Sequence, residues 1–403
     1  MIPQNLIDKI ASFNTPDDLK KAGVYPYFRP IEEANDTEVI IDGRKILMFG
    51  SNSYLGLTNH PKVKESAKKA IDQYGTSCSG SRFLNGTSKL HIELEEKIAR
   101  FVRKEAALVF TTGFQTNLGI LSALTGRTGI LILDELNHAS IIEGSRLSFS
   151  RVLKFRHNDM DDLAKIVSGL PYDQVKMIVV DGIFSMEGDI CNLPEITMLS
   201  QKYNSMVMVD DAHAFGVLGD HGRGTADHFN LNSEVDIIMS TFSKSLASVG
   251  GFAASTKEII NYIKHTSRPM IFSASIPPSG AAAALAALEI MESEPERLQN
   301  LWANTEYLSS HLKQLGFTLA HTESPIIPIY IRDNDLTFKF NQRLFEKGIF
   351  ANPVVSPAVK NDSALIRMSV MATHTKYQLD TVIEKLREVA RELNVFELIQ
   401  SNS

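Results

Sequence analysis

The chain has 403 residues, of which 43% are hydrophobic and 22% charged, and its formal net charge at pH 7 is −6. That length suffices for two domains with buried cores, and the acidic balance argues against a nucleic-acid-binding protein, whose surface is usually basic. The chain has only two cysteines, so we expect no disulfides and a cytoplasmic location. No apolar run approaches the ~20 residues of a membrane span, so we expect a soluble protein without a stable membrane anchor and with peripheral membrane contact at most.

Residues 1–47 are of mixed composition and are predicted to form an N-terminal arm. From residue 48 to about 285, short apolar runs alternate with amphipathic helical segments such as "LHIELEEKIARFV". Near-continuous apolar strands that alternate with helices are typical of a mostly parallel sheet covered on both faces. This segment is therefore predicted to be a large α/β domain, with strands at 106–111, 129–133, 176–182, 206–211, 236–240 and 251–255.

The last segment, 286–403, follows a helical stretch that begins at Pro277. It contains two further strand-like runs, "IIPIYI" and "ALIRMSV", and it closes with a long amphipathic pattern over 377–399. These elements predict a smaller C-terminal α+β domain.

The candidate site lies just after the predicted strands, because open α/β sheets bind ligands beyond the carboxyl ends of their strands. Lys244 is notable there, since the segment "STFSKSLASVGGF" surrounds it with hydroxyls and places two glycines after it. The other strand ends also carry groups that can bind or react, namely Gly113 at a predicted helix start, His138, Ser185, Asp210 with His213, and Thr241 with Ser243.

Each of these residues also has a simpler explanation. A lone lysine is most often a solvated surface charge, but the neighbours of Lys244 are small, hydroxylic and uncharged. A P-loop is excluded, because it requires glycine directly before the lysine. Taken singly, Asp210 and His213 would more often be a turn carboxylate and a core histidine, His138 a helix cap, and Gly113 a tight turn. Their combination at one edge of a sheet is what indicates a site.

One cofactor, pyridoxal phosphate, uses all of these groups at once. It needs a lysine for a Schiff base, a carboxylate beside its ring nitrogen, a donor near its phenolic oxygen, and a helix N-terminus with hydroxyls for its phosphate. A partly buried site also lowers the pKa of a lysine and so supplies the neutral amine that attacks a carbonyl. We therefore predict pyridoxal phosphate as the cofactor and no metal. Lys244 would form the Schiff base, Asp210 would lie beside the ring nitrogen, and His213 would lie near the phenolic oxygen. The backbone of Gly113 and Phe114, with Thr241 and Ser243, would bind the phosphate, and His138 would lie over the ring face.

Longer motifs carry a family resemblance that covers essentially the whole chain. The segments "FGSNSYLGL", "GSRFLNGT", "FTTGFQTN", "DGIFSMEGD", "VMVDDAHAFGVLG" and "TFSKSLASVGGF" resemble those of the α-oxoamine synthases, which are fold-type I pyridoxal-phosphate enzymes, and occur in that family's order. The resemblance implies a seven-stranded, mostly parallel sheet in the large domain. It also implies the decarboxylative condensation of an amino acid with an acyl thioester.

Within this family, the segments "YFRPIE", "NHASIIEGSRLSFS", "FSASIPPS", "NPVVSPAV" and "IRMSVMATHT" are most similar to the members that join L-serine to a long-chain acyl-CoA such as palmitoyl-CoA. Their product is 3-ketodihydrosphingosine, the first intermediate of sphingolipid synthesis. Two siblings, 8-amino-7-oxononanoate synthase and 2-amino-3-ketobutyrate CoA ligase, share most catalytic groups and are the alternative. A non-catalytic family subunit is disfavoured, because it lacks the lysine that is present here as Lys244.

The resemblance also implies roles for individual residues. Lys244 and His138 would be the catalytic groups, the first as the Schiff-base lysine and the second stacked on the ring and able to donate a hydrogen bond to a reacting carbonyl. Arg367 and Asn52 would hold the substrate carboxylate. The remaining contacts to the cofactor would come from Ser185, Asp210, His213, Thr241 and Ser243.

A homodimer with shared active sites is the last implication. Ser273 and Ala274 would then reach the phosphate bound to the other subunit. Their surroundings, "MIFSASIPPS", are uncharged and mostly apolar, which suits a surface that another chain covers.

Overall fold

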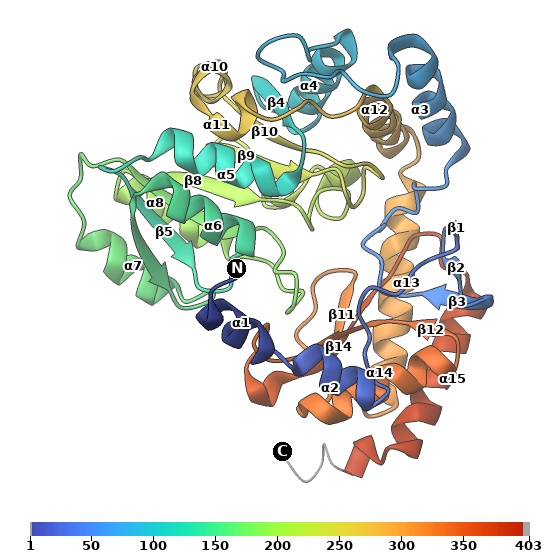
Figure 1. Cartoon of the computed structure of the whole chain (residues 1–403). Coiled ribbons are helices and arrows are strands. Elements are labelled where there is room, and N and C mark those ends of the chain that lie inside the picture. The colour runs from blue at the N-terminus through green and yellow to red at the C-terminus, as the bar shows by residue number, and fades with distance from the viewer. Residues whose placement is uncertain (1, 398–403) are drawn as a thin grey trace.

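The computed structural model of the protein describes residues 2–397 and shows two bodies connected by a long helix (Figure 1). The larger body is built on a seven-stranded sheet with the strand order β4-β10-β9-β8-β7-β5-β6. Neighbouring strands are parallel, except that β10 runs antiparallel to both β4 and β9. The predicted α/β fold with a mostly parallel seven-stranded sheet is confirmed.

Six of the seven strands lie where the apolar runs predict them. The seventh, β6 (Arg151–Phe155), pairs with β5 at one edge of the sheet, and its sequence "RVLKF" is largely exposed. An edge strand of this kind has no continuous apolar run, which explains why the sequence pattern did not reveal it. The six are β4 (Ala106–Phe110), β5 (Ile130–Asp134), β7 (Lys176–Asp181), β8 (Met206–Asp210), β9 (Ile237–Thr241) and β10 (Gly251–Ser255).

Helices bury both faces of this sheet, since successive strand residues point to opposite sides. Ile130 and Ile132 enter one core, and Leu131 and Leu133 enter the other. The first core is covered by α3 (Pro61–Tyr74), α4 (Lys89–Phe101), α7 (Met160–Ser168), α8 (Leu193–Lys202), α9 (Thr225–His228) and α12 (Pro278–Ser293). The second is covered by α5 (Gly113–Leu124), α6 (Ala139–Ser148), α10 (Lys257–Thr266) and α11 (Arg268–Ile271).

The smaller body has its own core around a three-stranded antiparallel sheet of order β11-β14-β13. Two of these strands, β11 (Ile326–Tyr330) and β14 (Leu365–Ser369), are the predicted ones, and β13 (Asn352–Val354) is short. The helices α14 (Asn334–Glu346) and α15 (Lys376–Glu392) pack on it. The helix predicted over 377–399 forms as α15 only as far as Glu392, a turn follows at Leu393 and Asn394, and the last two predicted residues lie outside the described ones.

Helix α13 (Glu296–Gln314) connects the two bodies and belongs to both cores. Leu301 packs in the core of the larger body, whereas Leu308 and Leu312 pack in that of the smaller one. The proposed domain limit at 285 falls inside α12, whose Ile290 and Met291 still belong to the larger core. The division at 47 and 285 stays a prediction.

Part of the N-terminal segment also pairs with a strand of the smaller body. β1 (Glu33–Asn35), β2 (Glu38–Ile41) and β3 (Arg44–Met48) form a sheet with β12 (Ile349–Phe350), which lies parallel to β3. Asp42 and Gly43 connect β2 to β3, and both have positive φ angles of 51° and 67°. An Asp-Gly pair with these angles is the preferred two-residue hairpin turn.

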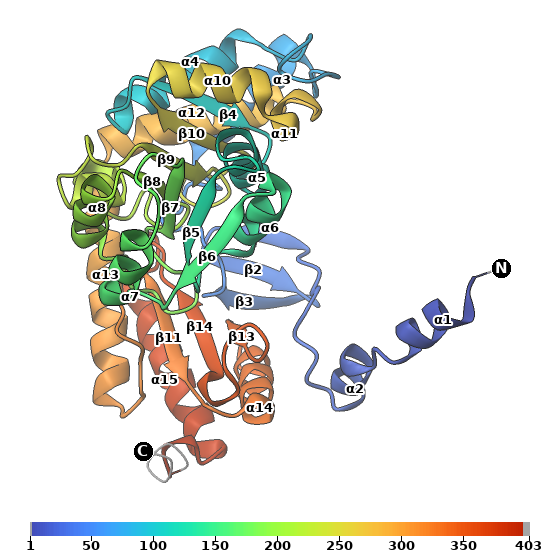
Figure 2. The same ribbon diagram turned by 90° about the vertical axis from the view of Figure 1, so that its left-hand side faces the viewer.

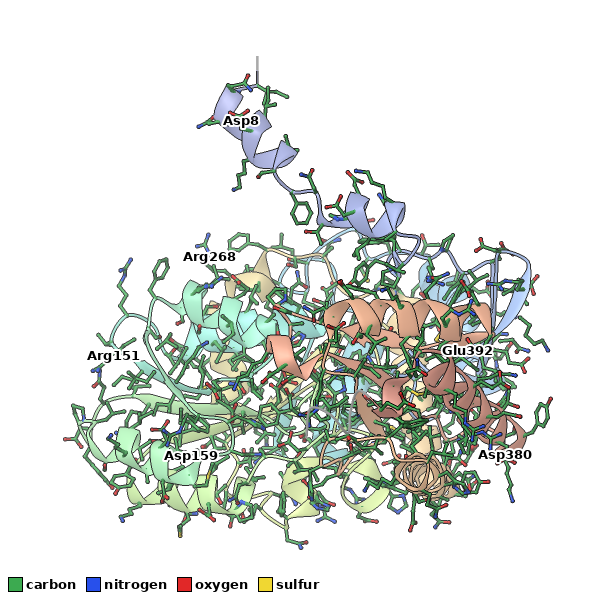
Figure 3. All side chains as sticks on the ribbon, turned by 90° about the horizontal axis from the view of Figure 1, so that it is seen from below. Asp8, Arg151, Asp159, Arg268, Asp380 and Glu392 are labelled. Carbon is green, nitrogen blue, oxygen red and sulfur yellow. The ribbon has the colours of Figure 1, made fainter. Side chains whose placement is uncertain are left out.

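The remaining N-terminal helices, α1 (Gln4–Ala11) and α2 (Thr15–Lys21), contain no buried residue. Helix α1 stands away from the rest of the molecule, as Asp8 on it shows (Figures 2 and 3). Within residues 2–397, no helix combines the length and apolar character needed to cross a bilayer.

Candidate active site

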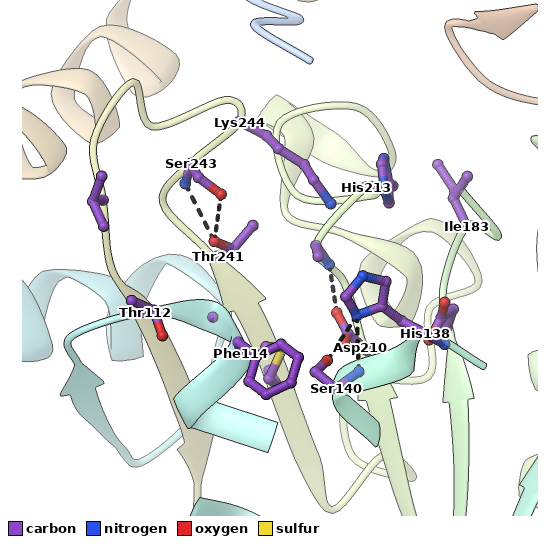
Figure 4. A pocket seen from close by; sticks show the side chains of 15 residues that line it. Thr112, Phe114, His138, Ser140, Ile183, Asp210, His213, Thr241, Ser243 and Lys244 are labelled. Atoms are coloured by element: carbon purple, nitrogen blue, oxygen red, sulfur yellow. Dashed lines mark hydrogen bonds between the residues drawn. The ribbon is translucent and has the colours of Figure 1, made fainter. Parts of the chain in front are cut away.

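A cavity of about 340 Å³ opens at the carboxyl ends of the parallel strands (Figure 4). Parallel strands end at the same edge of the sheet, so residues distant in the sequence meet there. Its lining includes eight of the predicted site residues, namely Gly113, Phe114, His138, Asp210, His213, Thr241, Ser243 and Lys244.

Lys244 follows β9, and its amine points into the cavity between Ser243 and His213 (Figure 4). Burial lowers the pKa of this amine from 10.5 to about 7. The nearby Asp210 carboxylate opposes this lowering of the pKa, whereas the Arg367 guanidinium adds to it. Much of the amine is therefore neutral near pH 7, which is the form that attacks a carbonyl or accepts a proton.

Asp210 is the last residue of β8 and forms the floor of the cavity with only 4% of its surface exposed. Its Oδ2 accepts a hydrogen bond of 2.7 Å from the amide of Asn117, and its Oδ1 accepts one of 3.0 Å from the backbone N–H of Ala212. These donors hold the carboxylate in place, opposite the lysine amine. It can thus keep a proton on a ring nitrogen that faces it.

His138 caps the N-terminus of α6 and connects to Asp210 through a chain of hydrogen bonds. The amide of Asn117 donates both to Asp210 and, over 2.8 Å, to the hydroxyl of Ser140. Ser140 in turn bonds Nδ1 of His138, with its backbone N–H at 3.3 Å and its hydroxyl at 2.8 Å (Figure 4). Because Nδ1 accepts from a backbone N–H, the proton of neutral His138 lies on Nε2. Burial also lowers the pKa of His138, which favours this neutral form.

His213, three residues after Asp210, is buried and lies 2.7 Å through its Nδ1 from the hydroxyl of Tyr54. Burial, followed by the charges of Lys244 and Arg367, holds the pKa of His213 well below its ordinary value. Burial raises the pKa of Tyr54 to about 12. Both side chains are therefore neutral at physiological pH.

The start of α5 forms a cradle of donors opposite the hydroxyls after β9. The hydroxyl of Thr112 accepts from the N–H of Gln115, while the N–H groups of Gly113 and Phe114 have no hydrogen-bond partner among residues 2–397. A Cβ on Gly113 would lie 2.7 Å from the Cβ of Thr241, so only glycine lets the two segments approach this closely. Free N–H groups at a helix N-terminus bind phosphate.

Arg367, Asn52 and Ser185 form a second cluster, which involves both bodies. Arg367 lies on β14 of the smaller body and is 5% exposed. Its Nε donates to the carbonyl of Ser185 over 2.6 Å, and its Nη1 and Nη2 each donate to Oδ1 of Asn52 over 3.2 Å. The structure thus brings these three predicted residues together, although they lie outside the lining of the 340 Å³ cavity.

Ser273 and Ala274 do not line the cavity of their own chain. The hydroxyl of Ser273 accepts a hydrogen bond of 2.9 Å from the amide of Gln115, and the carbonyl of Ala274 accepts one from Thr111. The neighbouring Phe272 is 74% exposed, a large apolar side chain in contact with solvent.

A partly buried ionic contact holds the segment that carries Ser185 against the sheet. The Nδ1 of His157 lies 3.0 Å from Asp134 at the end of β5, and its Nε2 lies 2.9 Å from Asp189. Burial alone would lower the pKa of His157, but its hydrogen bonds to the two carboxylates more than reverse this and raise it to about 10. His157 is therefore a cation that connects the sheet to the 182–190 segment.

Four residues of the site were not predicted from the sequence. Asp181 ends β7 directly beside Asp210 on β8, so the same strand-end argument could have found it. Burial, followed by the charge of Asp210, holds the pKa of Asp181 well above its ordinary range. Tyr54, Asn117 and Ser140 act through other side chains, and no pattern in the sequence signals such indirect contacts.

These features define a pyridoxal-phosphate enzyme of fold type I. The residues present fit the cofactor, since one cavity is surrounded by an amine of lowered pKa, a fixed carboxylate and two helix-start N–H groups that have no partner among residues 2–397. The volume also lies within the ~300–1,000 Å³ usual for small-molecule sites.

Comparison with known proteins agrees with this class. Residues 44–386 match the sequence profile described as aminotransferase class I and II. The serine palmitoyltransferase of Sphingobacterium spiritivorum is 55% identical over 98% of this chain and 99% of its own length. The 8-amino-7-oxononanoate synthase of Thermoanaerobacter pseudethanolicus is 42% identical over 94% of this chain and 96% of its own.

A solved structure of serine palmitoyltransferase (SPT) with pyridoxal phosphate superposes with a TM-score of 0.94 at 34% identity, covering 98% of this chain and 100% of that one. The chain belongs to the aminotransferase class I and II family and, within it, to the pyridoxal-phosphate-dependent α-oxoamine synthases. The family predicted from the motifs is confirmed.

Proposed function

We propose that this chain is a serine palmitoyltransferase, which joins L-serine to a long-chain acyl-CoA and releases carbon dioxide and coenzyme A. The supporting observation is the position of the Arg367 cluster, a buried guanidinium beside a cavity that contains a reactive lysine and a fixed carboxylate. A guanidinium holds a carboxylate with two parallel hydrogen bonds, which suits an α-amino acid. The full-length likeness to serine palmitoyltransferases supports serine as that amino acid.

The residues of the chain divide the work of binding. Gly113 and Phe114, with Thr241 and Ser243, would hold the phosphate of the cofactor, Asp210 the proton of its ring nitrogen, and His213 its phenolic oxygen. Arg367 and Asn52 would hold the serine carboxylate, and His138 would lie over the ring. When bound, pyridoxal phosphate supplies a conjugated ring that takes up the electron pair left at the α-carbon.

Lys244 would move the proton at that α-carbon. Its neutral amine removes the proton from serine, and the α-carbon then forms a bond to the acyl carbonyl carbon. The thioester C–S bond breaks, and coenzyme A leaves as the thiolate, which takes a proton from solvent. The bond to the carboxylate breaks next and carbon dioxide departs. Lys244 returns a proton to the α-carbon, and the product is 3-ketodihydrosphingosine when the acyl group is palmitoyl. The Nε2–H of His138 can donate a hydrogen bond to the acyl carbonyl while charge develops on its oxygen.

The proposal includes a cytoplasmic homodimer whose active sites are shared. The exposed apolar side chain of Phe272 and the position of Ser273 and Ala274 outside their own cavity support a second copy on that surface. Both cysteines, Cys78 and Cys191, are free thiols, which suits a reducing compartment. Any membrane contact would be peripheral and transient.

The test is an assay of product mass. The protein loaded with pyridoxal phosphate is incubated with labelled L-serine, L-alanine or glycine, each combined with acyl-CoAs of increasing chain length. We expect 3-ketodihydrosphingosine from serine and palmitoyl-CoA. Lys244→Ala should abolish this product, whereas Lys264→Ala on the exposed face of α10 should leave it unchanged. A preference for alanine or glycine would identify a sibling enzyme, and no condensation product from any pair would refute the proposal.

A further inference from the structure

The contact between Tyr54 and His213 determines where the imidazole proton of His213 lies. The two side chains lie 0% and 8% exposed, and their polar atoms are only 2.7 Å apart. Water does not reach the phenol ring, so the proton in this contact must belong to one of the two partners. The identity of the donor decides which nitrogen of His213 is protonated.

Two arrangements of protons are compatible with neutral side chains. In the first, the Tyr54 hydroxyl donates to Nδ1 of His213, and the imidazole proton lies on Nε2. In the second, Nδ1–H donates to the Tyr54 oxygen, and the hydroxyl proton must find another acceptor. The nearest alternative is Oδ1 of Asn52 at 3.5 Å, which is at the outer limit of a hydrogen bond.

That alternative acceptor is already occupied. Oδ1 of Asn52 accepts from both terminal nitrogens of Arg367 at 3.2 Å and lies 3.4 Å from the hydroxyl of Ser369. The guanidinium of Arg367 also lies near enough to Tyr54 to oppose the rise of its pKa, and a guanidinium can only donate. Of the two acceptors within reach of the Tyr54 hydroxyl, Nδ1 of His213 at 2.7 Å is thus far better placed than Oδ1 of Asn52, so the hydroxyl proton is directed to His213.

We propose that Tyr54 is a positioning residue that fixes His213 as its Nε2–H tautomer, so that His213 acts as a hydrogen-bond donor within the cavity. Nε2 has no partner among residues 2–397, and His213 lines the cavity beside Lys244. A donor at that place suits an anionic oxygen such as the phenolic oxygen of the cofactor, and to that extent the inference rests on the proposed function. Without Tyr54, the imidazole could rotate or change tautomer and present a bare nitrogen instead.

The inference concerns the protein before any substrate binds, so its test does not depend on which amino acid the enzyme uses. The chain is labelled with 15N-histidine, and imidazole nitrogen shifts are recorded for the protein without and with pyridoxal phosphate. His213→Gln assigns the signals. Protonated and bare ring nitrogens have well-separated shifts, and His138, with its Nδ1 accepting from Ser140, serves as an internal reference.

We expect wild-type His213 to show a bare, hydrogen-bonded Nδ1 and a protonated Nε2, with and without the cofactor. Tyr54→Phe keeps the ring and removes the hydroxyl, and it should convert His213 to a mixture of tautomers. The matched control is Tyr203→Phe, a half-buried tyrosine on the same core whose hydroxyl has no hydrogen bond to residues 2–397. It should leave the His213 signals unchanged.

A second readout is the dissociation constant of pyridoxal phosphate, which should rise roughly two- to tenfold in Tyr54→Phe for the loss of one oriented hydrogen bond. A wild-type spectrum with a protonated Nδ1 would overturn the proposal even where Tyr54→Phe does not fold. An unchanged tautomer in a folded Tyr54→Phe variant would overturn it as well. Failure of the product assay with correct His213 shifts would instead count against the proposed reaction alone.

Discussion

Replacement of His157 by glutamine tests the ionic contact behind the active site. His157 joins Asp134 on β5 to Asp189 in the 182–190 segment, whose Ser185 carbonyl accepts from Arg367. Because the pKa of His157 is raised in the folded protein, its contribution to stability is fully present below the ordinary value of 6.5. That contribution is lost as the pH rises through about 10.

The magnitude follows from the two pKa values. Between the ordinary 6.5 and the folded value of about 10, each pH unit changes the free energy of unfolding by about 1.36 kcal/mol, which amounts to ~5 kcal/mol over the whole window. Integrated from pH 7 to pH 9 alone, the loss is about 2.5 kcal/mol. His157→Gln cannot take up a proton and should show none of this dependence.

The measurement is urea unfolding of the enzyme with bound cofactor at several pH values from 7 to 9, for wild type and variant in parallel. We expect the difference in unfolding free energy between them to shrink by about 2.5 kcal/mol over this range. His265→Gln, on the exposed side of α10, is the control and should run parallel to wild type. A constant difference between wild type and His157→Gln would mean that His157 is neutral in the folded protein and that the reasoning is wrong.

Three further predictions concern the site directly. Lys244→Ala should lose the covalent, borohydride-reducible link to pyridoxal phosphate, and mass spectrometry of the reduced protein would contradict its role by finding the adduct on another lysine. Arg367→Lys should weaken serine binding by roughly 1.5–3 kcal/mol, measured by titration of the cofactor absorbance with serine. Arg391→Lys, on an exposed face of α15, is the control and should bind serine like wild type. Equal serine affinities of wild type and Arg367→Lys would remove Arg367 from the site. Phe272→Asp should shift sedimentation at micromolar concentration from dimer towards monomer with loss of activity, whereas Tyr377→Asp, equally exposed on α15, should leave a dimer; a fully active wild-type monomer would refute the shared site.

Apolar runs and strand ends predict the larger body well, because a parallel sheet buried on both faces leaves a continuous signal in the sequence. Strand β10 lies over the residues predicted for it, but its antiparallel direction depends on a short return from β9, which apolar patterning does not encode. The four-stranded sheet was missed altogether, although Asp42 and Gly43 between two apolar runs are a recognisable hairpin signal. The partner strand β12 is only two residues long and leaves no apolar run of its own, so the sequence predicts an arm here and not a sheet.

The residues of the candidate site also fall into predictable and unpredictable groups. Residues that touch the cavity, such as Lys244 and Asp210, have chemically distinctive side chains at predictable positions. Residues that act through them do not, because the role of Asn117 or Tyr54 depends on a distance across the fold and not on spacing along the chain. Asn52 and Arg367 were identified through family motifs, and their contact with each other bridges segments 315 residues apart.

The pairing of β3 with β12 cannot form until late in synthesis, because the two strands lie far apart in the sequence. Asn352, the first residue of β13 and two positions after β12, donates to the carbonyl of Gly50, 302 residues earlier in the chain. At 5–20 residues per second, the hairpin of β2 and β3 waits roughly 15–60 s for that partner. During this interval the open edge of β3 and the apolar ring of Phe49, which ends fully buried, are available to other chains. The first strands to be synthesised are thus among the last to be protected, because the edge of β3 stays open until residue 350 has emerged.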